Sequence, residues 1–178
     1  MTRAARLLRA LRAERGGATV EFVLMFPLFM TVFMSSFEAS MLLVRQLVLE
    51  RALDVVIREV RLSTDRTFPP AVLRRSICDG APVLTRCLET LSIEIVRIDR
   101  ATYAIPAATA VCVDTNTAAV PAPVLGHRAA DDLMLVRACL SVDLFFPTSA
   151  YGLQLVEGGG DGTYRIAAAS AFVQEPGT

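Results

Sequence analysis

One long apolar segment near the start of the chain constrains the fold more than any other feature. It extends from Val20 to Val44, and Glu21 and Glu38 are its only charged residues. A helix over these residues would be roughly 37 Å long at about 1.5 Å per residue, and the hydrocarbon core of a bilayer is about 30 Å thick. The segment therefore predicts one membrane-spanning helix over residues 20–44.

The residues that precede this segment are strongly basic. Residues 1–16 contain regularly spaced arginines that are opposed by Glu14 alone: Arg3, Arg6, Arg9, Arg12 and Arg15. Because basic flanks stay in the cytoplasm, the positive-inside rule places the N-terminus inside and the rest of the chain outside. We expect residues 1–16 to form a cytoplasmic leader, residues 17–62 a long helix, and residues 63–178 a separate exported domain.

A secretory signal peptide would also combine a basic flank with an apolar stretch. Cleavage after such a stretch requires two small residues separated by one position. No such pair occurs between Thr31 and Met41, and the small residues Gly16 and Gly17 lie before the apolar segment instead. Cleavage at that point would remove the leader and leave the helix on the mature chain.

The residues around this point resemble a known family. Gly16, a four-residue spacer, Glu21 and Phe22 ahead of an apolar helix resemble a type IV prepilin signal. The longer stretch 16–28, together with Glu38, is similar to TadE-like pseudopilins of the tight-adherence (Flp-type) pilus system. Further similar stretches follow in the C-terminal half: Ile77-Cys78-Asp79 and residues 92–95, 136–139, 146–147 and 171–176.

This resemblance implies a role in assembly rather than in catalysis. It implies a minor pseudopilin of the bacterial inner membrane, with a periplasmic C-terminal domain, that takes part in pilus assembly and surface adhesion. A prepilin peptidase would cut between Gly16 and Gly17, and the protein would enter a surface pilus. The implied partners are that peptidase, the other pilus subunits, the inner-membrane assembly platform and membrane lipid, and no cofactor is implied.

Glu21 is the carboxylate that this resemblance singles out for assembly. A carboxylate inside a bilayer is normally paired, so an intramembrane acid is a functional hypothesis by default. After cleavage at Gly16, the new amino group of Gly17 would lie about one helical turn away, and in the family picture the carboxylate pairs with such an ammonium. Alternatively, Glu21 lies at the cytoplasmic headgroup boundary, but the spacing from Gly16 favours the assembly role.

Two further residues of the apolar segment call for an explanation. Pro27 removes one backbone hydrogen bond and is expected to kink the helix between Val23 and Pro27. Glu38 falls near the outer membrane boundary, where solvation would explain it, and a helix-to-helix contact is the alternative.

The helical pattern continues beyond the membrane. Apolar residues recur at intervals of three and four among charged ones, which predicts an amphipathic helix: Leu42, Leu49, Leu53, Val56, Ile57 and Val60. Residues 67–70, which end in Pro69-Pro70, predict that the helix stops before Ser63. An unbroken helix over residues 17–62 would be roughly 69 Å long, with about half of it outside the bilayer.

The remaining 63–178 region predicts a small α+β domain with an antiparallel sheet, so that the whole is pilin-like. The expected elements are a helix over 69–78, strands over 91–98 and 134–146, and a hairpin of 153–156 and 163–173 around the glycine-rich turn 158–162. Strict alternation along 134–146 predicts that this strand is half buried, with one polar face.

The four cysteines all lie in the exported part: Cys78, Cys87, Cys112 and Cys139. An even number in an oxidising compartment predicts two disulfides, although four cysteines allow three connectivities. We favour Cys78 with Cys87, which closes a local loop, and Cys112 with Cys139, which would join two strands. A zinc site is the rival, but no C-x-x-C spacing occurs and the one histidine, His127, lies in a proline-rich loop, so we expect no metal.

No pattern supports catalysis or nucleic-acid binding. The chain has one histidine, no glycine-rich phosphate loop, no recognisable nucleophile with its base, and a formal net charge of zero. We therefore expect no enzyme activity, no catalytic residue and no nucleic-acid partner. Two hypotheses remain: a processed minor pseudopilin, or an uncleaved single-pass protein whose periplasmic domain is a binding module or scaffold of the secretion or pilus machinery.

Overall fold

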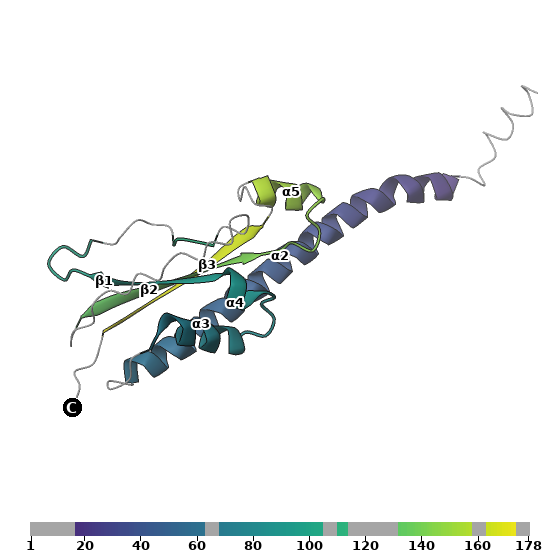
Figure 1. Ribbon diagram of the computed structural model, residues 1–178. Coiled ribbons are helices and arrows are strands. Elements are labelled where there is room, and N and C mark those ends of the chain that lie inside the picture. The colour runs from purple at the N-terminus through teal and green to yellow at the C-terminus, as the bar shows by residue number, and fades with distance from the viewer. Residues whose placement is uncertain (1–16, 63–67, 105–109, 114–131, 158–162, 174–178) are drawn as a thin grey trace, which may run out of the picture.

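The computed structural model describes residues 17–62, 68–104, 110–113, 132–157 and 163–173. Its elements are α2 (Gly17–Leu62), α3 (Pro70–Asp79), α4 (Cys87–Thr90), β1 (Leu91–Ile98), β2 (Leu133–Val142), α5 (Ala150–Glu157) and β3 (Tyr164–Val173) (Figure 1). The expected α+β class, with a long N-terminal helix and a small antiparallel sheet, is confirmed. The leader with Gly16, His127 and the glycine-rich turn 158–162 lie outside the described residues.

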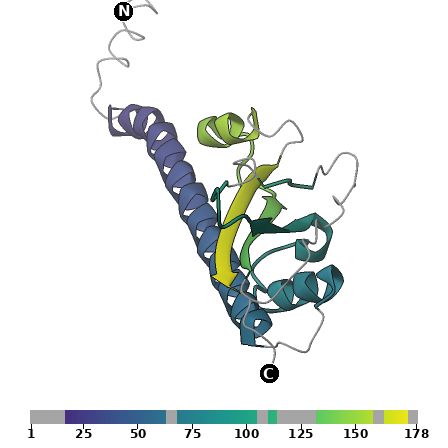
Figure 2. The same ribbon diagram turned by 90° about the vertical axis from the view of Figure 1, so that its left-hand side faces the viewer.

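The sheet is antiparallel, in the order β1-β2-β3, and it packs along the C-terminal half of α2 (Figure 2). We call the sheet, α3, α4, α5 and this half of α2 the head. The apolar stripe predicted along α2 is buried against the sheet and α3, as expected: Leu42, Leu49, Leu53, Val56, Ile57 and Val60. On the sheet side the core is completed by Leu91, Met134 and Leu140.

The central strand β2 differs from its prediction in length and in burial. It ends at Val142 rather than at Phe146, and both of its faces are largely buried. The face away from α2 is covered by residues 110–113, whose backbone carbonyls at Val111 and Val113 accept hydrogen bonds from Ser92 Oγ and Ser141 Oγ. The prediction of a half-buried strand was wrong because the covering segment comes from elsewhere in the chain.

Two disulfides tie the peripheral segments to this core. Cys78 at the end of α3 is bonded to Cys87 at the start of α4, with the two Cα atoms 5.7 Å apart. Cys112 is bonded to Cys139 of β2, with the Cα atoms 5.1 Å apart. These are the pairs that the sequence favours, but residues 110–113 form no strand, so the expectation that the second bridge joins two strands was wrong.

The chain between β2 and β3 forms a helix instead of the predicted first hairpin strand. Ser149 starts α5, because its Oγ accepts a hydrogen bond from the Gly152 N–H at 3.0 Å and its carbonyl accepts one from Leu153. Gly152 packs so close to the preceding turn that a Cβ there would lie 2.2 Å from the Phe146 carbonyl oxygen. The alternation of 153–156 was misread as a strand because the serine cap was overlooked.

Candidate functional site on helix α2

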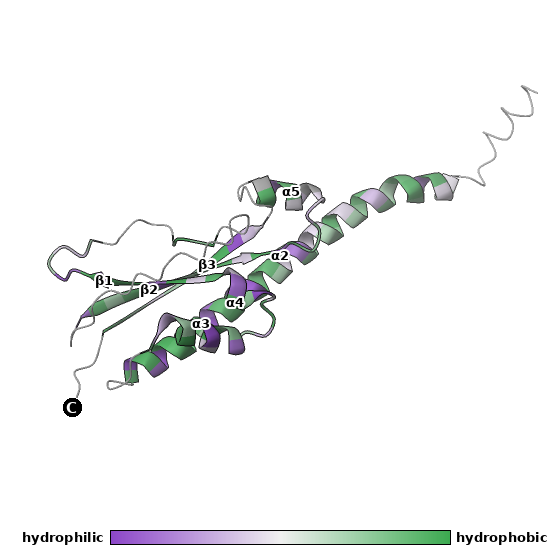
Figure 3. Ribbon diagram, in the orientation of Figure 1, coloured by the Kyte–Doolittle hydropathy of each residue, from purple (hydrophilic) through white to green (hydrophobic). Residues whose placement is uncertain are grey.

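The N-terminal part of α2 projects beyond the head (Figure 1). Residues 17–33 are exposed except for Met30, and Figure 3 shows mostly hydrophobic or near-neutral ribbon along this stretch. Within the described residues, α2 is the one helix long and apolar enough to cross a membrane, and its most apolar window is not buried in the head. A long exposed apolar surface of this kind requires lipid or protein partners.

Gly17 and Glu21, two of the residues singled out in the sequence, lie at the N-terminal end of the described part of this helix. Gly17 is the first residue of α2, and no atom lies within 4 Å of the position that a Cβ would take there. Glu21 lies one turn further along, is exposed, and has no hydrogen-bond or ion-pair partner within the described residues. Its carboxylate is therefore open to a group from outside the described part of the chain.

Pro27 lies inside α2, which stays α-helical on both sides of it. The N-terminal part of the helix bends away from the line of the rest in Figure 1. Proline removes one backbone hydrogen bond from an α-helix. The assignment of the bend to Pro27 stays a prediction.

Four hydroxyl side chains of α2 donate hydrogen bonds to carbonyls of the same helix. Thr31 Oγ1 donates to the Leu28 carbonyl at 2.7 Å, and Ser35 Oγ donates to the Thr31 carbonyl at 2.7 Å. Ser36 and Ser40 donate to the carbonyls four residues earlier in the same way. Because these four hydroxyls donate to carbonyls of their own helix, they do not need water as a partner at a surface that faces lipid.

Glu38 marks the point where α2 meets the head, and the solvated position expected for it was wrong. Its side chain is 0 % exposed. The carboxylate accepts hydrogen bonds from the backbone N–H groups of Phe145, at 3.2 Å, and Phe146, at 2.8 Å. These two N–H groups lie just after the end of β2, where no strand in the described part of the chain accepts their hydrogen bonds. The Glu38 carboxylate supplies the missing acceptor.

Arg45 holds the same segment two helical turns further along α2. Its side chain is 5 % exposed, and Nη1 donates to the backbone carbonyl of Asp143 at 2.7 Å. The guanidinium carbon also lies 4.8 Å from the centre of the Phe145 ring, which is a cation–π distance. Glu38 and Arg45 therefore bond the backbone of residues 143–146 through two N–H groups and one carbonyl. We call Glu38 and Arg45 the clamp and residues 143–146 the clamped segment.

The clamped segment has two further supports. The Phe37 ring makes edge-on contacts with the rings of Phe145 and Phe146, with centroids 5.8 and 5.9 Å apart. From the other side, Arg86 Nη1 lies 3.6 Å from the Asp143 carboxylate. The hydrogen bond from Arg86 to Glu89 and the charge of Asp143 raise the pKa of the exposed Arg86 guanidinium above its ordinary value.

The head itself offers little that resembles a reaction centre. Within the described residues there is no group of three or more His, Cys, Asp or Glu side chains placed to hold a metal ion. The buried ion pair of the sheet, Arg137 Nη2 to Glu94 Oε2 at 2.8 Å, joins residues that face each other across β1 and β2. This pair belongs to the packing of the sheet.

The sequence pointed to Gly16, Gly17 and Glu21 but missed the clamp. The signal for Glu38 was present, since it is a lone acid in an apolar run, yet its partners lie 107 and 108 positions away. Arg45 was seen only as one of the charges on an amphipathic helix. A buried pair of opposite charges spaced two turns apart on the apolar side of α2 could have pointed to a shared polar partner.

A known protein family matches the N-terminal part of the chain, which includes most of α2. Residues 16–58 match the family described as TadE-like protein, a stretch that contains Gly16, Gly17, Glu21, Pro27 and both α2 residues of the clamp. Searches among curated proteins and among solved structures found no match. The chain therefore carries the TadE-like N-terminal segment that its sequence resemblance predicted.

Proposed function

We propose that this protein is a minor pseudopilin of a tight-adherence pilus system, with no catalytic activity of its own. A prepilin peptidase cuts between Gly16 and Gly17, and the chain that begins at Gly17 assembles with other pilus subunits and with the inner-membrane assembly platform. The head lies in the periplasm, and the finished protein takes part in pilus assembly and surface adhesion. The TadE-like match over residues 16–58 supports the pilus system as the setting.

One observation carries this proposal: α2 is described as one unbroken helix over the 46 residues Gly17–Leu62, and its first part projects beyond the head (Figure 1). Removal of the leader would leave a mature chain that starts with a free apolar helix. Such a helix can lie in the bilayer before assembly and pack against neighbouring helices afterwards. An uncleaved anchor needs neither Gly16 ahead of the apolar helix nor Glu21 five positions beyond it.

Glu21 is the residue that we propose to determine which subunit packs beside this helix. The exposed carboxylate lies among apolar side chains, and its nearest aromatic neighbours, Phe22 and Phe26, stack on each other with centroids 5.1 Å apart. In lipid, an unpaired carboxylate is strongly disfavoured, so a cationic partner would be held firmly. We propose that the partner is the amino terminus of a processed subunit, either this one or an adjacent one.

Two substitutions test the proposal in cells that make the pilus. Gly16→Arg places a large cation at the cleavage point, so we expect the leader to be retained and piliation to be lost. Glu21→Ala leaves the cleavage point unchanged, so we expect normal processing but fewer pili and weaker co-purification with other subunits. Glu59→Ala, which removes an exposed carboxylate at the far end of α2, is the matched control and should change neither.

The outcomes separate the two hypotheses. Normal piliation by the Gly16→Arg protein would refute the pseudopilin assignment and favour an uncleaved anchor with a binding module. Unchanged pilus number and co-purification for Glu21→Ala would refute the assembly role of that carboxylate alone.

A further inference from the structure

The end of the head that contains α5 exposes large apolar side chains. Phe145 is 50 % exposed and Leu153 is 51 % exposed, and Tyr151 is partly exposed between them in sequence. Residues 147–156 contain no charged side chain. We call the clamped segment together with α5 the α5 end of the head.

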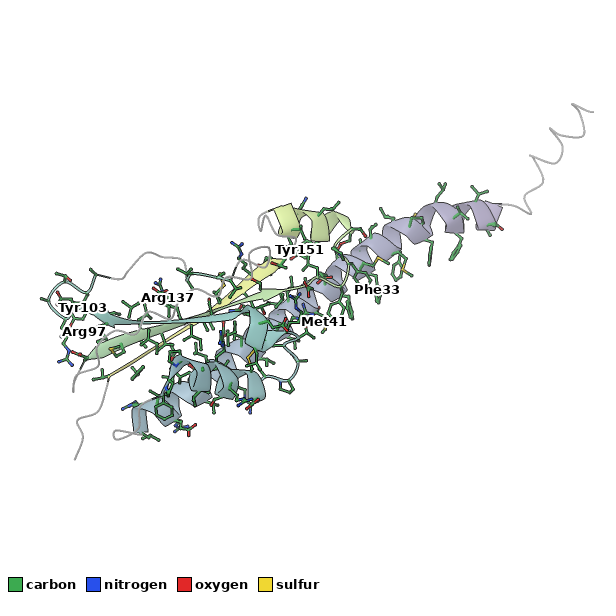
Figure 4. All side chains as sticks on the ribbon, viewed as in Figure 1. Phe33, Met41, Arg97, Tyr103, Arg137 and Tyr151 are labelled. Atoms are coloured by element: carbon green, nitrogen blue, oxygen red, sulfur yellow. A yellow bond between two sulfur atoms is a disulfide. The ribbon has the colours of Figure 1, made fainter. Side chains whose placement is uncertain are left out.

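This end of the head lies beside the free part of α2. In both ribbon views, α5 is the element of the head nearest the N-terminal end of α2 (Figures 1 and 2). Figure 4 labels Tyr151 on α5, and Phe33 on the projecting part of α2. The edge-on contacts of Phe37 with Phe145 and Phe146 make the apolar surface continuous from α2 onto the head.

The length of the free helix determines where this surface would lie relative to a bilayer. The clamp begins at Glu38, so we take the span to end there rather than at Val44, where the apolar segment ends. The described part of α2 outside the clamp, from Gly17 to Phe37, is roughly 31 Å long at about 1.5 Å per residue. A hydrocarbon core is about 30 Å thick, so a bilayer crossed by this part ends at about Phe37. The α5 end of the head then coincides with the lipid headgroup region.

The clamp prevents the head from moving away from that level. Glu38 and Arg45 both bond the backbone of the clamped segment, and the two residues lie two turns apart on one rigid helix. A head attached by a flexible linker could sit at any height above the lipid. Here the distance between the span and the α5 end is set by hydrogen bonds.

We propose that the α5 end of the head is a second membrane contact, in which Phe145, Tyr151 and Leu153 rest in the interface of the bilayer that α2 crosses. Tyrosine is enriched at this interface, and burial of apolar side chains strengthens binding to it. The charged residues of the α5 end, Asp143 and Glu157, lie at its two ends in sequence. The occupant of the surface is therefore lipid, while the protein is held in the membrane. This inference rests on the membrane-spanning role of α2 in the proposed function.

The test uses the absence of tryptophan from the chain, since any tryptophan introduced is a unique fluorescent reporter. The full chain is reconstituted into phosphatidylcholine vesicles, with or without the same lipid brominated near the top of its acyl chains. Leu153→Trp reports on α5, and Gln154→Trp is a second reporter on the same helix. Phe29→Trp reports on the middle of the free part of α2, and Val173→Trp is a control at the opposite end of β3, with a similar exposed fraction of 43 %.

We expect the brominated lipid to cause loss of emission from the Phe29→Trp and the α5 reporters and to leave the Val173→Trp reporter unchanged. Loss from Phe29→Trp without loss from either α5 reporter would overturn this inference while α2 still spans the bilayer. Emission from α5 that shifts to shorter wavelength without quenching would also overturn it, because a protein then covers the surface. No quenching at any position would overturn both this inference and the membrane-spanning role of α2.

Discussion

The carboxylate of Glu38 accepts the backbone N–H of Phe146 at 2.8 Å, across 108 positions of sequence. This bond and its companion to Phe145 attach the chain leaving β2 to the helix that carries the apolar N-terminal segment. The contact fixes the position of the head along the axis of α2, so the apolar segment is attached to the folded domain without a flexible linker.

Removal of the Glu38 carboxylate should weaken this attachment. In Glu38→Leu two partly buried N–H groups lose their acceptor, and we expect the free energy of unfolding of the head to fall by about 1–2 kcal/mol. Glu38→Gln keeps one carbonyl acceptor and should lose less. Chemical denaturation in detergent, followed by far-ultraviolet circular dichroism, measures the change, and Glu59→Gln on the exposed side of α2 is the control.

The same substitution has a local signature. Hydrogen exchange at the Phe146 amide should accelerate in Glu38→Leu more than exchange at the centre of β2 does. Equal acceleration everywhere would mean that Glu38 stabilises the fold only globally and would contradict a clamp.

Arg45 should act on the same segment as Glu38. Arg45→Met keeps the apolar stem but removes the bond to the Asp143 carbonyl and the cation over Phe145, and we expect a loss of about 1–2 kcal/mol. Because both residues hold residues 143–146, the Glu38→Leu and Arg45→Met effects should be less than additive in the double variant. Strict additivity would show that the two contacts are independent. Arg51→Met, at an exposed position of α2, is the control.

The two disulfides should differ in what their removal does. Cys112 and Cys139 are 27 positions apart, and Cys78 and Cys87 are 9 apart. In the loop-entropy model, replacing both cysteines by serine lowers the free energy of unfolding by about 3.5 kcal/mol for the Cys112–Cys139 bridge and by about 2.6 kcal/mol for the Cys78–Cys87 bridge. Denaturation midpoints of the two paired variants measure this order. A reversed order would mean that native packing, rather than loop length, determines the loss.

The buried ion pair of the sheet should be sensitive to the loss of one partner. Arg137→Met leaves the Glu94 carboxylate largely buried without its cation, and we expect a loss of about 3–5 kcal/mol. The double variant Arg137→Met with Glu94→Leu should be more stable than Arg137→Met alone, because no buried charge remains. A double variant that is less stable would contradict the assignment of this pair to sheet packing.

Sequence patterns predicted the parts of the fold that local chemistry determines. An unbroken helix over the described residues 17–62 was predicted from a continuous apolar segment followed by an amphipathic stripe. The helix α3 was predicted over 69–78 from its first proline and is observed one residue later, at Pro70–Asp79, whereas β1 was predicted at its observed bounds. The disulfide pairs were favoured from loop length and from the alternation around Cys112 and Cys139.

The candidate site was only partly predictable, because the clamp is non-local. Glu38 was assigned to solvent from its position in the chain, and no local pattern could reveal that the N–H groups of Phe145 and Phe146 would approach it. Because β2 was predicted to extend to Phe146, those N–H groups were expected to bond a neighbouring strand. Because 153–156 was predicted as a strand, α5 was not expected. The burial of the second face of β2 could not be predicted either, because the residues that cover it, 110–113, come from a distant part of the chain.

The intact mass of the protein purified from native membranes tests the central claim most directly. Measured before reduction, and again after reduction and alkylation, it reports both the first residue and the state of the cysteines. The account predicts a chain that begins at Gly17, with four alkylated thiols that appear only after reduction. A chain that still carries the arginine-rich leader would contradict prepilin processing and would make the protein a static membrane anchor.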